Sequence, residues 1–270
     1  MDDTDRRRLG RVFEDVPELY DRVRPTYPDE LFAELVAITG MHARSSVLEV
    51  GCGTGQATVA LAERGCAIVC VELGASMAAV ARRKLARFAS VQVEVAAFED
   101  WPLPAQPFDT VLAATAFHWL DPATRVGKCA DALRAGGALA IVATHHIAGG
   151  DAEFFAAAQT CYERWDPATP PGLRLQSAAD IPRDADEVDR SGRFGPAVFR
   201  RYEWEVAYST AQYIDTLLTY SGHRALAAER RQGLLACIAD LIDSHYGGQI
   251  RKRYLSELRV AQVRPSLSRA

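Results

Sequence analysis

The sequence lacks a long apolar run: nowhere do 18 or more consecutive residues stay apolar, and the first ten residues, MDDTDRRRLG, are mostly charged. A bilayer-spanning helix needs about 20 predominantly apolar residues, and a secretory signal needs an apolar segment near the N-terminus. The sequence therefore predicts neither feature. We expect a cytoplasmic protein without a membrane partner.

A surplus of positive charge is also missing, because 31 Lys and Arg residues stand against 35 Asp and Glu residues, which gives a net charge of -4. Proteins that bind nucleic acids through their phosphates present a basic surface. The short clusters RRR and RKR are more typical of solvated helix faces. We expect no DNA or RNA partner.

Cysteine is scarce, and its six positions are scattered. Cys66 and Cys70 are the closest pair, but in a strand they lie about 13 Å apart, too far for a disulfide and awkward for one metal ion. The six histidines also lack the spacing of metal ligands. The sequence predicts no metal site, and it predicts cysteines that are small buried residues in a reducing compartment.

The first half of the chain alternates between strand-like and helix-like segments. The predicted strands are residues 46–50, 67–72, 91–96, 108–117 and 138–144, and the predicted helices are 29–39, 56–64, 77–88 and 121–134. Such alternation indicates an α/β fold with a doubly wound, mostly parallel sheet, as in Rossmann-like proteins.

The second half changes in texture. Residues 151–165 are helical, and 166–197 are rich in Pro, Gly and Asp, as in a long loop. The end of the chain contains strands at 199–209 and 251–264 and helices at 210–220 and 230–247. We predict a cofactor-binding core at 1–150, a helical and loop cap at 151–197 on the substrate side, and late elements at 198–270 that complete the same domain.

The stretch VGCGTGQ follows the first predicted strand and carries Gly51, Gly53 and Gly55. Alternate glycines permit a tight turn and let a ligand approach the backbone. A dinucleotide loop has its third small residue where this chain has Gln56, which disfavours a pyrophosphate ligand. Glu72 ends the second predicted strand, where a carboxylate can bind the two hydroxyls of a ribose.

The segments LEVGCGTG and VCVE resemble the first two motifs of class I S-adenosylmethionine-dependent methyltransferases. Four further segments are similar to small-molecule members related to the trans-aconitate and malonyl-carrier carboxyl methyltransferases: YDRVRPTYPDEL, FEDWPL, FDTVLAATAFHWLDP and LRAGGALAIV. The resemblance covers residues 13–145 in the expected order. The later segment YSTAQYIDTLLTYSGH resembles the variable substrate side of the same group less specifically.

The resemblance implies S-adenosylmethionine as the cofactor and a set of residues that hold it. Glu49 and the three loop glycines would lie along its methionine and ribose, and Glu72 would bind the ribose hydroxyls. The Phe98 N–H and the side chain of Glu99 or Asp100 would face the adenine, although many relatives have aspartate where this chain has Ala97. The remaining predicted cofactor contacts are Tyr20 and Arg24, which match a segment that closes over the cofactor, and Ala114 in the fourth predicted strand.

Three residues are candidates for the acceptor side. His118 follows the fourth strand and is the predicted base or acceptor-orienting group, with Trp119 beside it. Purely structural roles for both stay open. His145 and His146 end the fifth predicted strand, where adjacent side chains point to opposite faces, and we take His145 as the substrate contact.

We therefore expect methyl transfer from S-adenosylmethionine to a small-molecule acceptor, with O-methylation of a carboxylate or hydroxyl favoured. A carboxylate is ionised at neutral pH, whereas a hydroxyl needs a base. One alternative is a nicotinamide-dependent oxidoreductase, disfavoured by Gln56 and by the lack of a Tyr/Lys pair on one helical face. Another is a noncatalytic, cofactor-binding or partner-activating module on the same fold.

Overall fold

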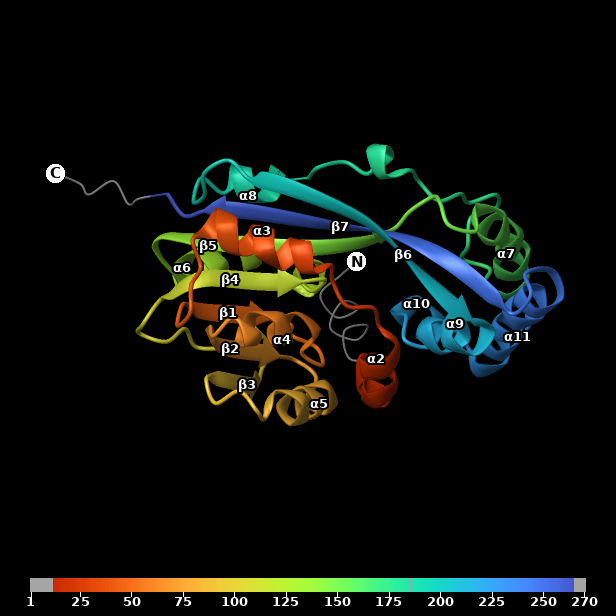
Figure 1. The fold of residues 1–270 in the computed structure, drawn as a ribbon, viewed down its shortest axis with the longest axis horizontal. Coiled ribbons are helices and arrows are strands. Elements are labelled where there is room, and N and C mark those ends of the chain that lie inside the picture. The colour runs from red at the N-terminus through yellow and green to blue at the C-terminus, as the bar shows by residue number, and fades with distance from the viewer. Residues whose placement is uncertain (1–11, 185, 265–270) are drawn as a thin grey trace.

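A computed structural model describes residues 12–184 and 186–264 of the chain (Figure 1). Its strands are β1 (Ser46–Val50), β2 (Ala67–Glu72), β3 (Val91–Val95), β4 (Phe108–Ala114), β5 (Leu133–His146), β6 (Val198–Ser209) and β7 (Gln249–Gln262). Its α-helices are α2 (Pro17–Val23), α3 (Asp29–Thr39), α4 (Gln56–Glu63), α5 (Ala75–Leu85), α6 (Arg125–Ala132), α7 (Ala152–Trp165), α8 (Asp186–Arg190), α9 (Thr210–Leu217), α10 (Ser221–Ala225) and α11 (Ala228–His245). Short 3₁₀ turns are η1 (Val12–Asp15), η2 (Phe117–Trp119) and η3 (Ala178–Asp180).

The seven strands form one sheet in the order β3-β2-β1-β4-β5-β7-β6. Neighbouring strands are parallel from β3 to β5, and β7 is antiparallel to both β5 and β6. The strand order reverses between β1 and β4, and a doubly wound sheet binds ligands in the crevice at such a reversal. The predicted fold class is confirmed.

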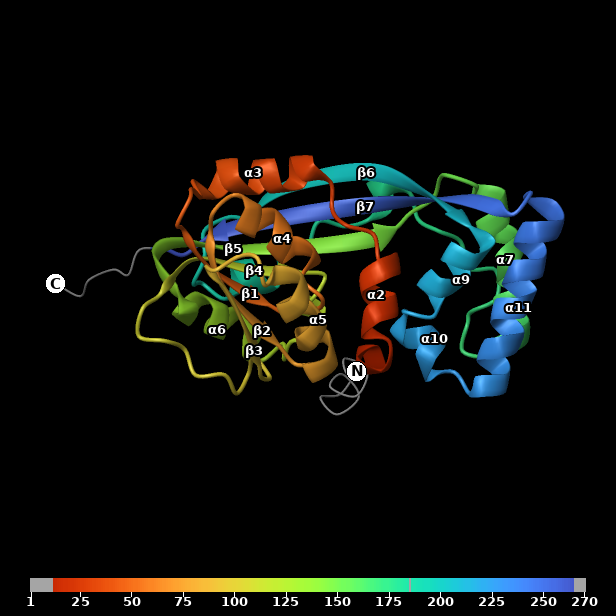
Figure 2. The ribbon, with the colours of Figure 1, turned by 60° about the horizontal axis from the view of Figure 1, so that its bottom comes forward.

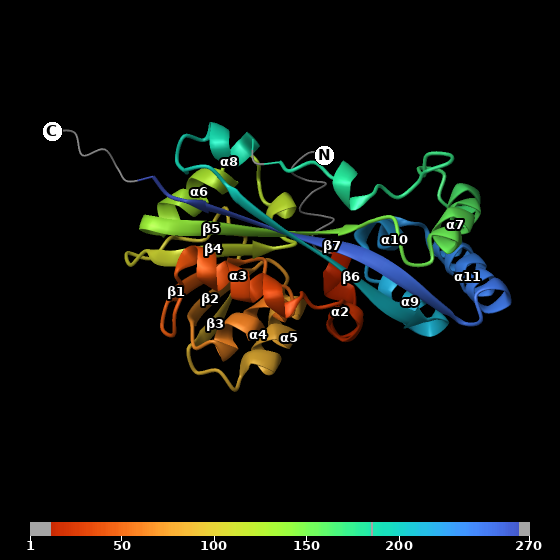
Figure 3. The same ribbon diagram turned by 45° about the horizontal axis from the view of Figure 1, so that its top comes forward.

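The central strands are apolar on both faces because helices cover both. Val47 packs with α3 and α4, whereas its neighbour Leu48 packs with residues of α6 and α8. Figure 3 shows α3, α4 and α5 on one side of the sheet and α6 and α8 on the other. This arrangement explains why β1 carries buried apolar residues on both faces, Val47 on one and Leu48 on the other, and does not alternate with exposed ones.

The last three strands extend beyond the other four. β5 and β7 have 14 residues each and β6 has 12, and their far ends carry α7, α9 and α11 as a second lobe (Figure 2). This lobe has its own apolar core, which joins Phe154, Leu217 and Ile238 from the helices to Tyr208 and Ile250 from the strands. We call α7 with α9, α10 and α11 the helical cap.

The segment 166–197 contains only the short η3 and α8 among its described residues, as predicted. It leaves α7 and returns along the sheet toward α6 (Figure 1). Most of the helical cap therefore comes from residues after 209, and the domain boundaries at 150 and 197 stay a prediction.

The predicted helix at 121–134 is too long at both ends. Residues 121–124 form a turn in which the Asp121 carboxylate accepts hydrogen bonds from the Ala123 N–H at 3.1 Å and the Thr124 hydroxyl at 3.3 Å. At the other end Leu133 already pairs with Phe108 as part of β5. The Asp-Pro pair begins a turn that precedes the helix. An aspartate side chain can accept hydrogen bonds from the N–H groups of a turn as well as from those at a helix N-terminus.

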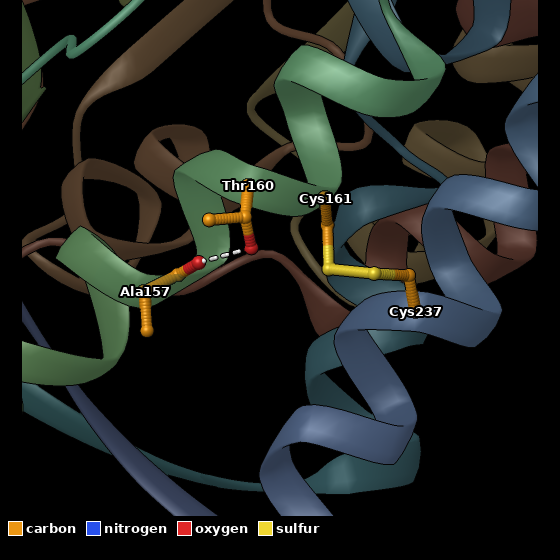
Figure 4. Close-up of a disulfide and its surroundings, with 4 residues drawn as sticks. All are labelled: Ala157, Thr160, Cys161 and Cys237. Atoms are coloured by element: carbon orange, nitrogen blue, oxygen red, sulfur yellow. Dashed lines mark hydrogen bonds between the residues drawn. A yellow bond between two sulfur atoms is a disulfide. The ribbon is translucent and has the colours of Figure 1, made fainter.

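The prediction that all cysteines are unpaired is wrong for two of them. Cys161 of α7 and Cys237 of α11 form a disulfide across the helical cap (Figure 4). The two residues are 76 positions apart, so only the packing of α7 on α11 brings them together. Cys66 and Cys70 are free and buried, as predicted. Disulfides are rare in reducing compartments, so this pair is at odds with the compartment that the sequence predicts.

Gly233 in α11 gives a test of the packing between α7 and α11. Alanine normally stabilises a helix interior by about 1 kcal/mol relative to glycine. A Cβ at Gly233 would lie 2.5 Å from the Trp165 ring, and overpacking costs about 1–3 kcal/mol. We expect Gly233→Ala to lower the free energy of unfolding by roughly 1–2 kcal/mol in urea titrations.

Gly127→Ala in α6 is the matched control, because nothing lies within 4 Å of its added Cβ. It should leave stability unchanged or raise it by up to about 1 kcal/mol. Equal effects of the two substitutions would contradict the close contact of Gly233 with Trp165.

Candidate active site

The turn from β1 into α4 is built on three glycines with positive φ: Gly51 at 69°, Gly53 at 58° and Gly55 at 87°. Residues with a side chain rarely adopt this conformation. A Cβ on Gly51 would also lie 2.7 Å from the Ala116 Cβ, so this backbone passes directly beside the end of β4. The loop therefore leaves main-chain atoms at the crevice of the sheet.

Glu72 at the end of β2 fixes this loop. One carboxylate oxygen accepts the Gly53 N–H at 2.8 Å, and the other accepts the Gly74 N–H at 2.8 Å. Burial raises the pKa of Glu72, and these two N–H groups oppose that rise. Each carboxylate oxygen has a second lone pair, so Glu72 can shape the loop and still accept hydrogen bonds from two ligand hydroxyls.

The glycine loop opens into a cavity of about 470 Å³, which we call the cofactor cavity. Most of the predicted cofactor contacts line it, together with both residues predicted beside the fourth strand: Tyr20, Arg24, Glu49, Gly51, Gly53, Glu72, Phe98, Glu99, Ala114, His118 and Trp119. Gly55 does not line it; it precedes α4 and faces Leu85 of α5. One oxygen of Glu99 is already used, since it accepts the Asp121 N–H at 2.8 Å.

Glu49 on β1 is a buried acid whose hydrogen bonds are incomplete among the described residues. Its side chain is 1% exposed, and its Oε2 has no hydrogen-bond partner among the described residues. Burial raises the pKa of Glu49 to about 8, against a hydrogen bond with Thr58. The buried Gln56 Nε2 also lacks a partner in the described part of the chain. A ligand that brings a positive charge into the cofactor cavity would satisfy Glu49.

A second cavity of about 430 Å³ lies against the helical cap, and we call it the acceptor cavity. Its wall is largely aromatic, with Phe155, Tyr162, Trp204 and Tyr213, and its polar members include His146, His223 and Lys252. Seven residues line both cavities: Tyr20, Arg24, Tyr27, Gln56, Thr115, Thr144 and Tyr220. The two cavities are therefore adjacent and share a wall.

Arg24 is the centre of that shared wall. Its Nε donates to the Thr219 hydroxyl and its Nη2 to the Thr219 carbonyl, each at 2.8 Å. The guanidinium also lies 4.8 Å from the Tyr20 ring centre and 4.4 Å from that of Tyr220. These contacts join α2 to the helical cap, so Arg24 contributes to both cavities.

Thr115 lies on the same wall in a strained conformation, with φ of 55° directly after β4. Its hydroxyl is 2.9 Å from the Tyr27 hydroxyl, and burial raises the pKa of Tyr27, which keeps that phenol protonated. Residues held in the left-handed region without glycine cost about 1–3 kcal/mol and cluster at functional sites. The strain here lies where the two cavities meet.

The structure separates the candidate histidines. His118 is exposed in η2 and lines the cofactor cavity but not the acceptor cavity, which does not favour its predicted role as a base. His145 was the wrong choice of the adjacent pair, since it lines neither cavity and is influenced electrostatically by Glu257 and Arg201 on the opposite face of the sheet.

His146 faces the acceptor cavity, together with Thr144, because side chains alternate along β5. Its ring centre is 4.5 Å from that of Phe155, and its Nε2 has no partner among the described residues. Burial, assisted by the nearby charge of Lys252, lowers the pKa of His146 to about 2. The ring is therefore neutral and accepts or donates hydrogen bonds without charge.

Sequence reasoning missed Lys252, which lies in the last strand. Lys252 is buried although it stands between Arg251, which is exposed, and Arg253, which is half-buried. Ile250, Lys252 and Tyr254 are alternate residues of β7, and all three are buried. The two-residue period of a strand was therefore the signal that could have placed Lys252 on the inward face. Tyr220 lies in the segment YSTAQYIDTLLTYSGH, whose resemblance to the variable substrate side was the available signal.

Residues 47–137 match the family described as the methyltransferase domain. Over this segment the chain is similar to class I S-adenosylmethionine-dependent methyltransferases. An uncharacterized methyltransferase of Mycobacterium tuberculosis is 36% identical over 137 residues, which are 51% of this chain and 54% of the relative. The malonyl-[acyl-carrier protein] O-methyltransferase of Geobacter sulfurreducens is 36% identical over 43% of this chain and 45% of its own. The chain thus spans about half the length of these curated relatives.

Among solved structures, a candidate type II methyltransferase from Anaeromyxobacter dehalogenans superposes with a TM-score of 0.62. The two are 26% identical, and the match covers 90% of this chain and 99% of that one. The structural match therefore extends over more of this chain than the 137-residue sequence match does.

S-adenosylmethionine is the cofactor that this similarity implies, and the cofactor cavity fits it. Glu72 and the open Gly53 backbone suit a ribose, and the unpartnered Glu49 oxygen suits a positively charged methionine portion. Within the described residues, no cluster of His, Cys, Asp and Glu is arranged to hold a metal ion, and no helix is long and apolar enough to cross a membrane.

Glu49 makes cofactor binding dependent on pH. With a pKa of about 8, its carboxyl is mostly protonated in the free protein at pH 6–7, and a bound cation requires the ionised form. Affinity for S-adenosylmethionine should therefore rise with pH, by about tenfold per unit between pH 6 and 7. Calorimetry in two buffers of different ionisation enthalpy should show the released proton. Glu49→Gln should abolish this dependence, and a wild-type affinity independent of pH would contradict the assignment.

Glu72→Ala should weaken cofactor binding by roughly tenfold or more, because charged hydrogen bonds contribute about 1.5–3 kcal/mol. The fold should survive because the residue lies at a strand end, although the thermal unfolding midpoint should fall, since the Gly53 and Gly74 N–H groups lose their acceptor. Glu63→Ala, which removes an exposed partner of Arg87, is the control and should leave affinity unchanged. An unaltered dissociation constant in folded Glu72→Ala would remove this residue from the site.

Proposed function

We propose that this protein transfers a methyl group from S-adenosylmethionine in the cofactor cavity to an oxygen atom of a small molecule in the acceptor cavity. The observation that carries this proposal is the wall of seven residues shared by the two cavities. A wall that both ligands touch is the place where a methyl donor and its acceptor can meet.

The chain's contribution to such a reaction is mainly orientation. Methyl transfer is an in-line displacement, and the bound cofactor supplies the activated methyl group. Correct positioning of two reactants supplies about 7–11 kcal/mol of the barrier reduction. Glu72 and the glycine loop hold one side, and Arg24, Tyr27 and Thr115 set the boundary that the acceptor approaches.

The acceptor cavity favours a small, partly aromatic molecule. Its volume of about 430 Å³ lies within the range of ordinary small-molecule sites, about 300–1,000 Å³. Its hydroxyl, imidazole and ammonium groups suit an oxygen-bearing acceptor. The similarity to a malonyl-[acyl-carrier protein] O-methyltransferase supports transfer to oxygen.

The similarity of residues 47–137 to the methyltransferase domain disfavours the nicotinamide alternative, although a Tyr/Lys pair does exist on separate elements, with 2.8 Å between the Tyr220 hydroxyl and Lys252 Nζ. A noncatalytic module would bind cofactor without any turnover. Measurement of methyl transfer separates that alternative from the proposal.

Ala158→Phe tests the acceptor cavity. Ala158 of α7 lines this cavity and not the cofactor cavity, so a phenyl ring there occupies acceptor space. With methyl-labelled S-adenosylmethionine and a panel of small phenols and carboxylic acids, wild type should transfer label to at least one acceptor. The variant should lose at least about tenfold in kcat/KM and keep its cofactor affinity.

Ala157→Phe is the control, since Ala157 lines neither cavity. It should retain transfer. Cofactor binding by wild type with no transfer to any acceptor, or full activity in Ala158→Phe, would refute the proposed function.

A further inference from the structure

Tyr220 occupies the position that a proton acceptor for this reaction requires. It is one of the residues that line both cavities. Its hydroxyl lies 2.8 Å from Lys252 Nζ, and the Arg24 guanidinium lies over its ring at 4.4 Å. A general base must reach the acceptor oxygen directly, and the shared wall provides that reach.

Lys252 is buried and has no negatively charged partner among the described residues. Its residue is 3% exposed, and no salt bridge to it is found among the described carboxylates. Its Nζ lies 5.9, 5.0 and 5.0 Å from the ring centres of Tyr213, Tyr220 and Tyr254. A buried, unpaired charge is costly, and the phenolate form of Tyr220 would supply the missing counter-charge.

The surroundings of Tyr220 favour its ionisation over that of its neighbours. The titratable groups around it are Tyr20 of α2, Arg24 directly after α2, Tyr162 of α7, Tyr213 of α9, His223 of α10, Tyr208 of β6, and Lys252 and Tyr254 of β7. Burial alone would raise the pKa of Tyr220, but the charges of Lys252 and Arg24 outweigh it and lower that pKa. The neighbouring His223 adds no charge, since burial lowers its pKa to about 4.

The other eight tyrosines behave in the opposite way. The pKa of each is raised, with burial as the largest cause: Tyr20, Tyr27, Tyr162, Tyr202, Tyr208, Tyr213, Tyr246 and Tyr254. Tyr220 is therefore distinguished by its two cationic neighbours.

We propose that Tyr220, paired with Lys252, is the general base of the methyl transfer and removes the proton from a phenolic hydroxyl of the acceptor. This inference rests on the proposed function and narrows its acceptor class. The aromatic wall of the cavity suits a phenol, and a phenol needs deprotonation at neutral pH whereas a carboxylic acid does not.

The step balances without a further reactant. The proton moves from the acceptor oxygen to the Tyr220 phenolate oxygen, and Lys252 keeps its own proton throughout. The acceptor oxygen uses a lone pair to form the new bond to the methyl carbon, while the carbon–sulfur bond breaks and leaves its electron pair on sulfur. Tyr220 then releases the proton to solvent before the next cycle.

The first experiment needs neither cofactor nor acceptor. Tyrosinate absorbance of the full chain, followed against pH, should show one tyrosine ionising below the ordinary value of about 10 and ahead of the rest. Tyr220→Phe should remove this first step. Lys252→Met should move it upward by at least about one pH unit, because an adjacent opposite charge shifts a pKa by 1–3 units.

Arg251→Met is the matched control, since it removes the same charge from the adjacent position of β7, where the side chain is exposed. Its titration should equal that of wild type. An early step that persists in Tyr220→Phe, or that Lys252→Met leaves in place, would overturn the inference whatever the activity.

The second experiment uses the phenol that wild type methylates best. Its kcat/KM should rise with pH to a plateau through the same value as the early tyrosinate step. Tyr220→Phe keeps the ring in the shared wall but removes the hydroxyl, so it should lose about 10²–10⁴-fold in kcat, and Lys252→Met should shift the rising limb upward. Transfer to carboxylic acids alone, with a flat profile, would overturn the inference and leave the proposed function intact. An early tyrosinate step without transfer to any acceptor would refute the proposed function instead.

Discussion

The antiparallel pairing of β7 between β5 and β6 is the constraint on which both cavities depend. Residues 254–262 of β7 pair with β5 inside the cofactor-binding lobe, whereas residues 249–253 pair with β6 alone. That short extension carries the strand surface on which the helical cap packs. Lys252 lies in it, opposite Val206, so this extension supplies part of the wall of the acceptor cavity.

The shared wall follows from this extension. Arg24, directly after α2, binds Thr219 after α9, and Lys252 binds Tyr220 one residue later, so the N-terminal segment and the last strand meet at one corner of the cap. Two cations and several phenols gather there, and Asp166 is the one acidic residue among the described residues that line the acceptor cavity. The excess positive charge at this corner stabilises an anion in the acceptor cavity. The same residues, Arg24 and Lys252, therefore make the contacts that hold the corner together and supply the charge for its chemistry.

Sequence reasoning located the cofactor cavity well because its residues are local. Gly51, Gly53 and Glu72 belong to one strand-helix-strand unit, in which a positive φ and a strand end define their positions before any long-range packing. The same logic failed where two adjacent residues competed, since choosing His146 over His145 depends on which face of β5 the cap covers. It also failed for Cys161 and Cys237, which only the contact of two helices pairs.

The sequence by itself therefore determined the doubly wound sheet, its glycine loop and the carboxylate at the end of β2, because hydrophobic period and glycine spacing are short-range properties of a chain. Only the tertiary structure decided the composition of the acceptor cavity. Its members come from α2, β5, α7, α9 and β7, and their meeting depends on strand register and helix packing over more than 200 residues, as the contact of Arg24 with Thr219 across 195 positions shows. At this meeting point the charges of Lys252 and Arg24 lower the pKa of Tyr220, against the effect of its burial.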